Sequence, residues 1–282
     1  MMASSGALPN LIIVGAQKCG TTSLHNYLQV HPEIAMARIK ETNFFLKDAN
    51  WDRGLDWYAS QFDSQAAVRG EGSPDYTNLP GSHGTAERMQ QVIPGARIVY
   101  LVRDPLERIA SHYVHFRAAG LERRAFEQAV AAPDNEYVAR SCYATQLEPF
   151  LRCFGHERVL VETHERLLHD RLPTLQRIFR FVGVDDSFVS DDFERIWERT
   201  EGKGRGYSLA FRAAKRMRGR AGWLPQSMRW PVQRLLRSRL AGRPIERPTF
   251  DERLLALVRE RLLGEVDELR RVSGLELEGW LR

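Results

Sequence analysis

The sequence of 282 residues has no long hydrophobic run and only three cysteines. Cys19, Cys142 and Cys153 cannot all pair with one another, and none stands at a CxxC or Cys/His spacing typical of a metal site. No run of about 18 apolar residues exists to span a membrane. Residues 1–10 lack the basic start and apolar core of a signal peptide. These absences predict a cytoplasmic protein of a reducing compartment, with no metal and no transmembrane helix.

Acidic residues are missing from one long part of the chain. Between Gly202 and Ile245 there are 12 Lys or Arg and no Asp or Glu, so the net charge of +5 arises here. Tryptophan and leucine are interspersed with the arginines at 211–243, a mixture that suits docking on an anionic membrane, a lipid-like or anionic acceptor, or a partner protein. A peripheral membrane location is therefore a further expectation. No nucleic-acid-binding signature accompanies the basic residues, so nucleic acid is not an expected partner.

Apolar, β-branched runs predict four strands, at 11–14, 68–71, 97–102 and 159–161. Apolar residues at helical spacing predict a helix with Leu24, Tyr27 and Leu28 on one face, and helices at 105–115, 167–182 and 250–272. This alternation favours an α/β fold, a P-loop-like doubly wound parallel sheet with helices on both faces. We expect a single domain over 1–282, with a basic helical subdomain at 207–245 and a C-terminal helix at 249–273.

A glycine-framed loop, residues 15–22 (GAQKCGTT), follows the first predicted strand. The loop amides and the N-terminus of the next helix attract an anion, and Lys18 adds a full positive charge. The spacing of Gly15 and Gly20 copies a P-loop, but Thr21 stands where an NTPase has its lysine. The loop therefore predicts phosphate binding without ordinary ATP chemistry. The candidate ligands are Gln17, Lys18, Cys19, Gly20, Thr21, Thr22 and Ser23, with Cys19 as a small filler of the loop.

Two further segments begin at predicted strand ends, 71–76 (EGSPDY) and 103–111 (RDPLERIAS). Ligands of parallel sheets bind beyond the carboxyl ends of the strands. We therefore expect both segments to face one crevice together with the 15–22 loop.

Taken together, these segments resemble the sulfotransferase family, whose sulfuryl donor is 3′-phosphoadenosine 5′-phosphosulfate (PAPS). The 15–22 loop is similar to the family's 5′-phosphosulfate loop, and 103–111 is similar to its 3′-phosphate motif. Residues 40–45 (KETNFF) and 71–76 resemble segments of the heparan-type and bacterial branch, and 200–206 (TEGKGRG) resembles the late phosphate loop. Part of the heparan branch has a lysine where this chain has Gly72.

The resemblance implies roles for individual residues. PAPS would be the co-substrate, Lys18 would stabilise the leaving phosphate, and Arg103 and Ser111 would bind the 3′-phosphate. A bidentate guanidinium at a helix N-terminus suits a phosphate dianion. The late loop, through Lys203, Gly204 and Arg205, would form a basic lid over that phosphate. No metal is obligatory, because a transferred sulfuryl group carries less charge than a phosphoryl group.

The resemblance also implies a general base. Glu41 matches the family's base, and it would need burial near the acceptor to raise its pKa toward neutrality. A solvated ion pair between Lys40 and Glu41 is the alternative interpretation. His115, four residues after Ser111 and on the same helical face, is the other candidate.

Other polar residues receive structural or auxiliary interpretations. Glu71 would orient Lys18 or the acceptor, or it would cap the turn that follows its strand. Arg108 is expected on the solvated side of its helix. Trp51, Trp57 and Tyr58 are expected to pack against one another rather than stack on a ligand.

The sequence thus predicts an enzyme that moves a sulfuryl group from PAPS to a hydroxyl or amine of a small-molecule, glycan or lipid-linked acceptor. A P-loop kinase or NTPase is one alternative, disfavoured by Thr21 after Gly20. A non-catalytic module that binds a membrane or a partner through the basic segment is another.

Overall fold

The computed structural model describes residues 8–63, 65–133, 135–195 and 245–282, and these form two compact units. The first unit contains the described residues of 8–108, 138–195 and 258–282, and the second those of 109–137 and 245–257. Helices α4 (Pro105–Ala118) and α12 (Glu252–Ser273) contribute residues to both. The predicted lid residues Lys203, Gly204 and Arg205 and the basic 211–243 segment lie outside the described residues.

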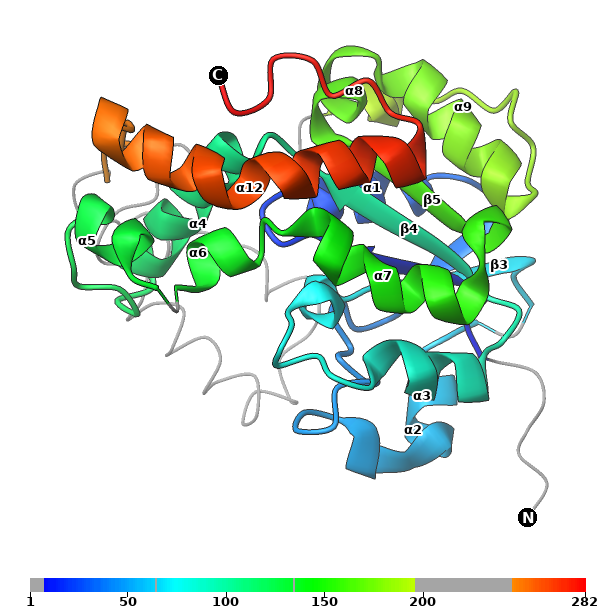
Figure 1. Ribbon diagram of the computed structural model, residues 1–282. Helices are drawn as coiled ribbons and strands as arrows, with labels where there is room; N and C mark the ends of the chain where they lie inside the picture. Colours follow the sequence, from blue (N-terminus) through cyan, green and yellow to red (C-terminus); the bar gives the residue numbers. More distant parts are fainter. Residues whose placement is uncertain (1–7, 64, 134, 196–244) are drawn as a thin grey trace, which may run out of the picture. The chain divides into compact units, whose positions relative to one another are not determined.

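A parallel five-stranded sheet forms the centre of the first unit (Figure 1). Its order is β2-β3-β1-β4-β5. The strands are β1 (Leu11–Gly15), β2 (Ile34–Met36), β3 (Val68–Gly72), β4 (Arg97–Val102) and β5 (Val159–Thr163). The chain leaves β1 toward one edge and later crosses to β4 on the other side. The carboxyl end of β1 is therefore the switch point at which a doubly wound sheet opens a ligand crevice.

Helices cover both faces of this sheet (Figure 1). Helices α3 (Thr85–Val92) and α7 (Tyr143–Phe154) pack side by side on one face. Helix α1 (Thr21–Leu28) covers the other, where His31 after its end contacts Phe179 of α9 (Arg171–Val182). The remaining helices are α2 (Gly54–Ala59), α5 (Phe126–Ala131), α6 (Glu136–Ala139) and α8 (His164–His169), with short 3₁₀ helices η1 (Trp51–Arg53), η2 (Pro74–Thr77), η3 (His156–Arg158) and η4 (Asp191–Glu194).

The predicted fold class, a doubly wound parallel α/β sheet, is confirmed. Several elements differ from the prediction, and helices α2, α3, α5, α6 and α7 were not predicted at all. The sequence did not reveal β2, and the single helix expected at 167–182 is in fact α8 and α9, separated at Asp170, which leaves the helical conformation. The final helix begins at Glu252 and ends at Ser273. The interpretation as one domain with a basic subdomain stays a prediction.

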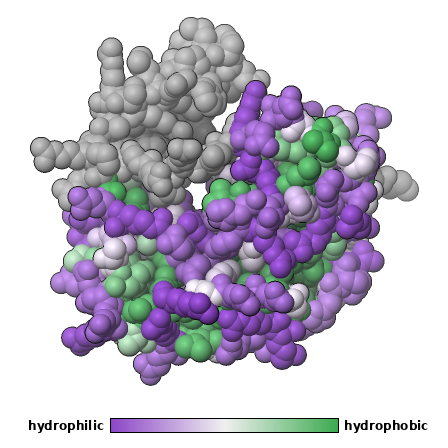
Figure 2. Space-filling view, turned by 90° about the horizontal axis from the view of Figure 1, so that it is seen from above, coloured by the Kyte–Doolittle hydropathy of each residue, from purple (hydrophilic) through white to green (hydrophobic). Residues whose placement is uncertain are grey.

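Burial explains why β1 forms the middle of the sheet. All four side chains from Leu11 to Val14 are fully buried, as expected for a parallel strand covered on both faces. Each contributes roughly 1.5–3 kcal/mol of hydrophobic stabilisation. On the face seen in Figure 2 the described surface is mostly hydrophilic, with separate hydrophobic areas. Among the described helices none is both long enough and apolar enough to cross a bilayer.

The second unit has an aromatic centre of its own. His112 packs edge-on against Phe116 and Tyr137, and Phe126 packs against Phe250. This packing makes His112 a structural residue of the unit.

Candidate active site

The 15–22 loop joins β1 to α1 at the switch point of the sheet. At Gly15 a side chain could not fit, because a Cβ there would lie 2.0 Å from Oγ1 of Thr77. That hydroxyl donates to the carbonyl of Val14, 3.0 Å away, and so ties η2 to the end of β1. Sequence and packing thus require a glycine where the strand ends and the loop begins.

Gly20 closes the loop and caps α1 in the left-handed conformation, with φ at 91°. A Cβ at this position would lie 2.6 Å from Nδ1 of His164, the first residue of α8. No side chain caps α1, and its first turn contains no acidic residue. The helix N-terminus therefore presents its amides and the positive end of its dipole to an anion.

Lys18 and Glu41, the two residues predicted for catalysis in the first unit, both have left-handed backbones. Their φ angles are 73° and 62°, and only Asn43 and Leu281 share this property among the described non-glycine residues. Non-glycine residues in this region cost free energy and cluster at functional sites. The surrounding structure thus holds the Lys18 backbone in a conformation that a lysine does not favour by itself.

Arg140 bridges the loop to the segment after β3. Its Nη1 donates to Oε1 of Gln17 at 2.9 Å and to Oδ1 of Asp75 at 3.0 Å. Its side chain is only 9% exposed, so water screens its charge little. Sequence reasoning missed this arginine, because its two partners are 123 and 65 residues away and no motif marks it.

Arg108 corrects the prediction of a solvated residue. It is fully buried and donates from Nε to Oγ of Ser141 at 2.6 Å. Burial lowers the pKa of its guanidinium, and Cys19 of the loop and Arg140 are among the groups that interact with its charge. The spacing of three and seven residues to Ser111 and His115 could have indicated this inward face.

Cys19 is fully buried beneath the loop. Its Sγ lies 3.6 Å from the hydroxyl of Tyr143, which also donates to the carbonyl of Arg103 at 2.8 Å. Burial raises the pKa of this thiol to about 11, so Cys19 stays a neutral filler of the loop, as predicted.

Arg103 directly follows β4, the strand beside β1, and its side chain forms an ion pair with Glu107 at 2.7 Å. Tyr143 connects its backbone to Cys19, so the structure brings Arg103 and the 15–22 loop together. Ser111 is buried and His115 half-buried on α4, within the second unit. The pairing of Ser111 with Arg103 and the role of His115 stay predictions.

Glu41 lies at the surface and forms an ion pair with Lys40. Its side chain is 47% exposed, as in the alternative interpretation of a solvated ion pair, and its role as the base stays a prediction. The structure instead buries Glu71, whose carboxylate accepts a hydrogen bond from Thr42, the residue after Glu41. Burial raises the pKa of Glu71 to about 7.

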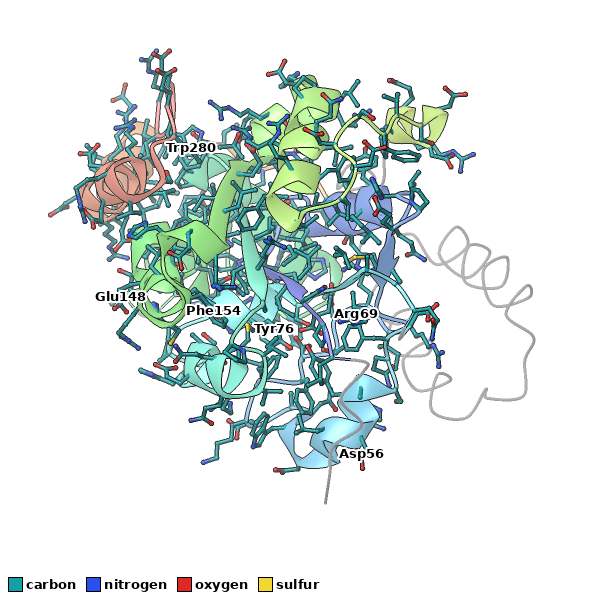
Figure 3. The ribbon with its side chains drawn as sticks, turned by 90° about the vertical axis from the view of Figure 1, so that its right-hand side faces the viewer. Asp56, Arg69, Tyr76, Glu148, Phe154 and Trp280 are labelled. Carbon is teal, nitrogen blue, oxygen red and sulfur yellow. The ribbon has the colours of Figure 1, made fainter. Side chains whose placement is uncertain are left out.

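The aromatic residues around this segment pack against one another, as expected. Phe44 stacks on Tyr58 at 4.1 Å between ring centroids and contacts Trp51 and Trp57. Figure 3 shows Tyr76 in the interior of the unit and Asp56 of α2 at its periphery.

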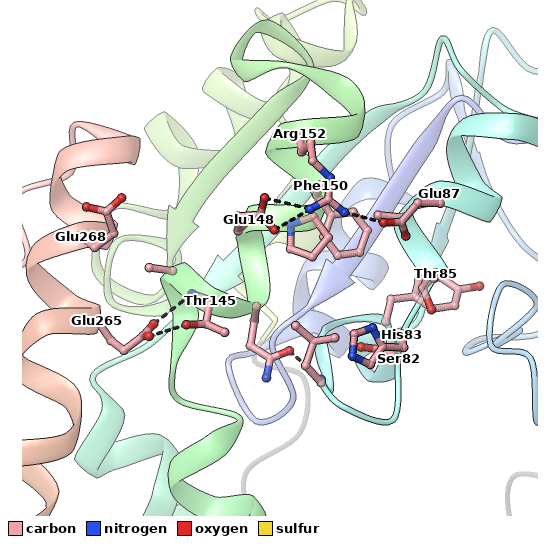
Figure 4. Close-up of a pocket in the computed structure, with 17 residues that line it drawn as sticks. Ser82, His83, Thr85, Glu87, Thr145, Glu148, Phe150, Arg152, Glu265 and Glu268 are labelled. Carbon is pink, nitrogen blue, oxygen red and sulfur yellow. Dashed lines mark hydrogen bonds and ion pairs between the residues drawn. The ribbon is translucent and has the colours of Figure 1, made fainter.

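A cavity of about 440 Å³ lies among α3, α7 and α12 (Figure 4). Arg152 in its wall pairs with Glu87 and Glu148, and Glu265 accepts hydrogen bonds from Thr145. None of its lining residues belongs to the 15–22 or 40–45 segments. Of the segments expected at the crevice, only 71–76 reaches this cavity, through Tyr76.

Comparison with known proteins gives consistent matches. The family model for the sulfotransferase domain matches residues 8–203. A solved sulfotransferase from Alicyclobacillus acidocaldarius has a TM-score of 0.69 and 25% identity, covering 98% of this chain and 100% of the other.

Curated relatives are matched over part of their length. The membrane-associated sulfotransferase kil1 of Dictyostelium discoideum is 35% identical over 54% of this chain and 31% of its own. Human heparan sulfate glucosamine 3-O-sulfotransferase 5 is 29% identical over 63% of this chain and 54% of its own. The chain thus spans a third to about half of the length of these two relatives.

Proposed function

The chain belongs to the sulfotransferase domain family, and from this premise we propose that it transfers a sulfuryl group from PAPS to a hydroxyl or amine of an acceptor. The observation that carries the proposal is Lys18, held with a left-handed backbone inside a glycine-framed loop at the switch point of the sheet. The loop has the N-terminus of α1 on one side and two buried arginines nearby.

These residues fit the donor chemically. PAPS supplies a sulfuryl group on a phosphate leaving group, together with a 3′-phosphate. The amides at Gly20, Thr21 and Thr22, with the hydroxyls of the two threonines, would hold the 5′ oxygens, beside Gln17, Cys19 and Ser23. Arg103, with Ser111, would hold the 3′-phosphate. Lys203, Gly204 and Arg205 would cover it.

Catalysis would rest on positioning and on charge compensation. Lys18 would neutralise the negative charge that develops on the leaving phosphate oxygen as the bond to sulfur breaks. Glu41 would accept the acceptor's proton, with His115 as the second candidate. No metal is required by this scheme, because the cations of the chain oppose the charge of the leaving group.

The names of the relatives support a first choice of acceptor class. Because several of them are named heparan sulfate sulfotransferases, sugar hydroxyls and amines are the first acceptors to test. Gly72 differs from the lysine of part of that branch, so small molecules and lipid-linked glycans remain alternatives. We place the enzyme in the cytoplasm, where it would dock on an anionic membrane through residues 211–243. A relative named membrane-associated supports this location.

The proposal is tested by thermal shift with 3′-phosphoadenosine 5′-phosphate (PAP) against ATP with Mg²⁺. We expect PAP to raise the melting temperature more than ATP–Mg²⁺ at equal concentration, because only PAP offers both a 5′- and a 3′-phosphate. A preference for ATP–Mg²⁺ would favour the kinase alternative. Binding of PAP without sulfuryl transfer from labelled PAPS to any acceptor in a fractionated cell extract would favour a non-catalytic module.

A further inference from the structure

The segment that carries Glu41 has no regular secondary structure of its own. Residues 38–50 contain neither helix nor strand, and the backbones of Glu41 and Asn43 are both left-handed, with φ at 62° and 48°. Because this conformation is unfavourable for a glutamate, other contacts must impose it. Those contacts determine where the Glu41 carboxylate can act.

Three hydrogen bonds fasten this segment to the end of β3 and to the residues that follow it. The Thr42 hydroxyl donates to Oε2 of Glu71, the Asn43 amide to Oγ of Ser73 at 3.0 Å, and the Phe45 amide to the Tyr76 hydroxyl at 3.3 Å. The acceptors follow one another along 71–76 as the donors do along 42–45. This parallel order explains why the two motifs, far apart in sequence, act as one structure.

Thr42 lies at the centre of this arrangement. It separates the two left-handed residues, is 1% exposed, and its carbonyl accepts a hydrogen bond from Nδ2 of Asn50 at 2.7 Å. Its hydroxyl oxygen also accepts from the Phe44 amide at 3.4 Å. Rotation at Thr42 would therefore break several contacts at once.

Glu71 is the one carboxyl among the three acceptors. It is fully buried, and the hydroxyls of Tyr58 and Tyr76 as well as Thr42 face it. A hydrogen bond to an ionised carboxylate is stronger than a hydrogen bond between two neutral groups. Losing the Thr42 hydroxyl would cost Glu71 a hydrogen bond that water cannot replace at a fully buried position.

We propose that Glu71 is a positioning residue of the active site, which acts through Thr42 to hold the backbone of Glu41 in its left-handed conformation. This inference rests on the proposed function, in which Glu41 is the base. The carboxyl of Glu71 itself does not contact the acceptor. Its effect on sulfuryl transfer passes entirely through the Thr42 hydroxyl and the Glu41 backbone.

The central test replaces Thr42 by valine, which keeps the shape and removes the hydroxyl. The assay measures transfer of the labelled sulfuryl group from PAPS to desulfated heparin, or to water as a minimal acceptor. We expect kcat to fall by roughly 10-fold to 100-fold with an unchanged KM for PAPS, because the base is misplaced while the donor site is intact. Thr42→Ser should restore turnover, and Thr174→Val, a buried threonine on α9, serves as the control.

The Glu41→Gln background separates positioning from a general structural role. If Thr42 acts through Glu41, Thr42→Val causes no further loss of kcat in Glu41→Gln. An equal fold-loss in both backgrounds, or wild-type turnover in Thr42→Val, overturns the proposal.

Hydrogen exchange gives a readout that needs no acceptor. In Thr42→Val and Glu71→Gln we expect the amides of Asn43 and Phe45 to exchange at least roughly 10-fold faster, with no change over 15–22. Unchanged exchange at these two amides contradicts the anchor. Failure of PAP to stabilise the wild-type protein would instead contradict the proposed function, so the two failures are distinguishable. If Glu71→Gln does not fold, Thr42→Val carries the test alone.

Discussion

Two segments each hold a predicted catalytic residue in a left-handed backbone, and they do so by different means. The loop around Lys18 uses glycine, at Gly15 and Gly20, and contacts that admit no side chain there. The segment around Glu41 contains no glycine between 40 and 45 and depends on hydroxyl and carboxyl acceptors from 71–76. The first segment can be recognised locally in the sequence, whereas the second is defined by residues from elsewhere in the chain.

The 71–76 segment connects these two segments. Asp75 pairs with Arg140, which also binds Gln17 of the Lys18 loop, while Glu71, Ser73 and Tyr76 hold the residues after Glu41. A single stretch, from Glu71 at the end of β3 to Tyr76, therefore supports the backbone beside both the predicted leaving-group cation and the predicted base. Substitutions at Arg140 and at Thr42 should therefore affect donor binding and proton transfer separately.

The largest effect is expected at Lys18. Replacing it by methionine keeps the apolar stem and removes the charge that opposes the leaving phosphate. We expect kcat to fall roughly 10²- to 10³-fold, as for loss of a transition-state charge stabiliser. Steady-state kinetics with labelled PAPS measure it, with the exposed Lys47→Met as the control. A rise in KM at constant kcat would instead mean that Lys18 only binds the ground state.

Much of the Lys18 side of this comparison could be predicted. An apolar run that ends at a glycine indicates a buried strand and a turn, and the doubly wound topology places its end at the crevice. Strand β2 could not be found, because three residues, Ile34–Met36, carry no periodic pattern. Arg108 was misassigned because a charged side chain on a helix is usually solvated, although its spacing to Ser111 indicated otherwise.

The Glu41 side could be predicted only through the family resemblance. Thr42 and Glu71 are 29 residues apart, and nothing in either motif shows that they form a hydrogen bond. Arg140 has no motif at all. Tertiary contacts between loops leave no periodicity in the sequence, so only a folded structure reveals which carboxyl is buried and which is exposed.

The stability of the anchor should depend on pH. Burial raises the pKa of Glu71 from 4.5 to about 7, although the hydrogen bond from Thr42 and the nearby hydroxyls of Tyr76 and Tyr58 lower it. Because the folded pKa lies above the unfolded one, the folded state keeps the proton more tightly. The resulting stabilisation is present below about pH 4.5 and is lost as the pH rises through about 7. The shift corresponds to about 3 kcal/mol.

Glu71→Gln removes this dependence. The unfolding free energy of the variant minus that of the wild type should therefore rise by about 3 kcal/mol between pH 4.5 and pH 7. Urea unfolding at a series of pH values measures it. His25 and His164, whose pKa values burial lowers to about 4, titrate in both proteins and cancel in the difference. Parallel curves for the two proteins would show that Glu71 does not hold its proton differently in the folded state.

Glu41→Gln should abolish proton transfer and leave the Lys18 loop intact. We expect turnover to fall roughly 10²-fold or more while PAP binding persists, because a general base contributes about this factor. Kinetics and thermal shift with PAP measure the two parts. The control is Glu127→Gln, an exposed glutamate on α5. Turnover near the wild-type level would transfer the role of base to His115.

The smallest effect is expected at Arg140, which contacts Gln17 of the Lys18 loop and not the reacting atoms. Arg140→Met removes the hydrogen bonds to Gln17 and Asp75 and a largely buried positive charge. We expect the Kd for PAP to rise roughly 10-fold, the loss typical of one charge-assisted hydrogen bond, with kcat little changed. Isothermal titration measures it, and Arg180→Met, exposed on α9, is the matched control. A kcat that falls as far as in Thr42→Val, with an unchanged Kd for PAP, would contradict this expectation. It would mean that Arg140 acts through Asp75 on the Glu41 segment, and that the two segments do not work separately.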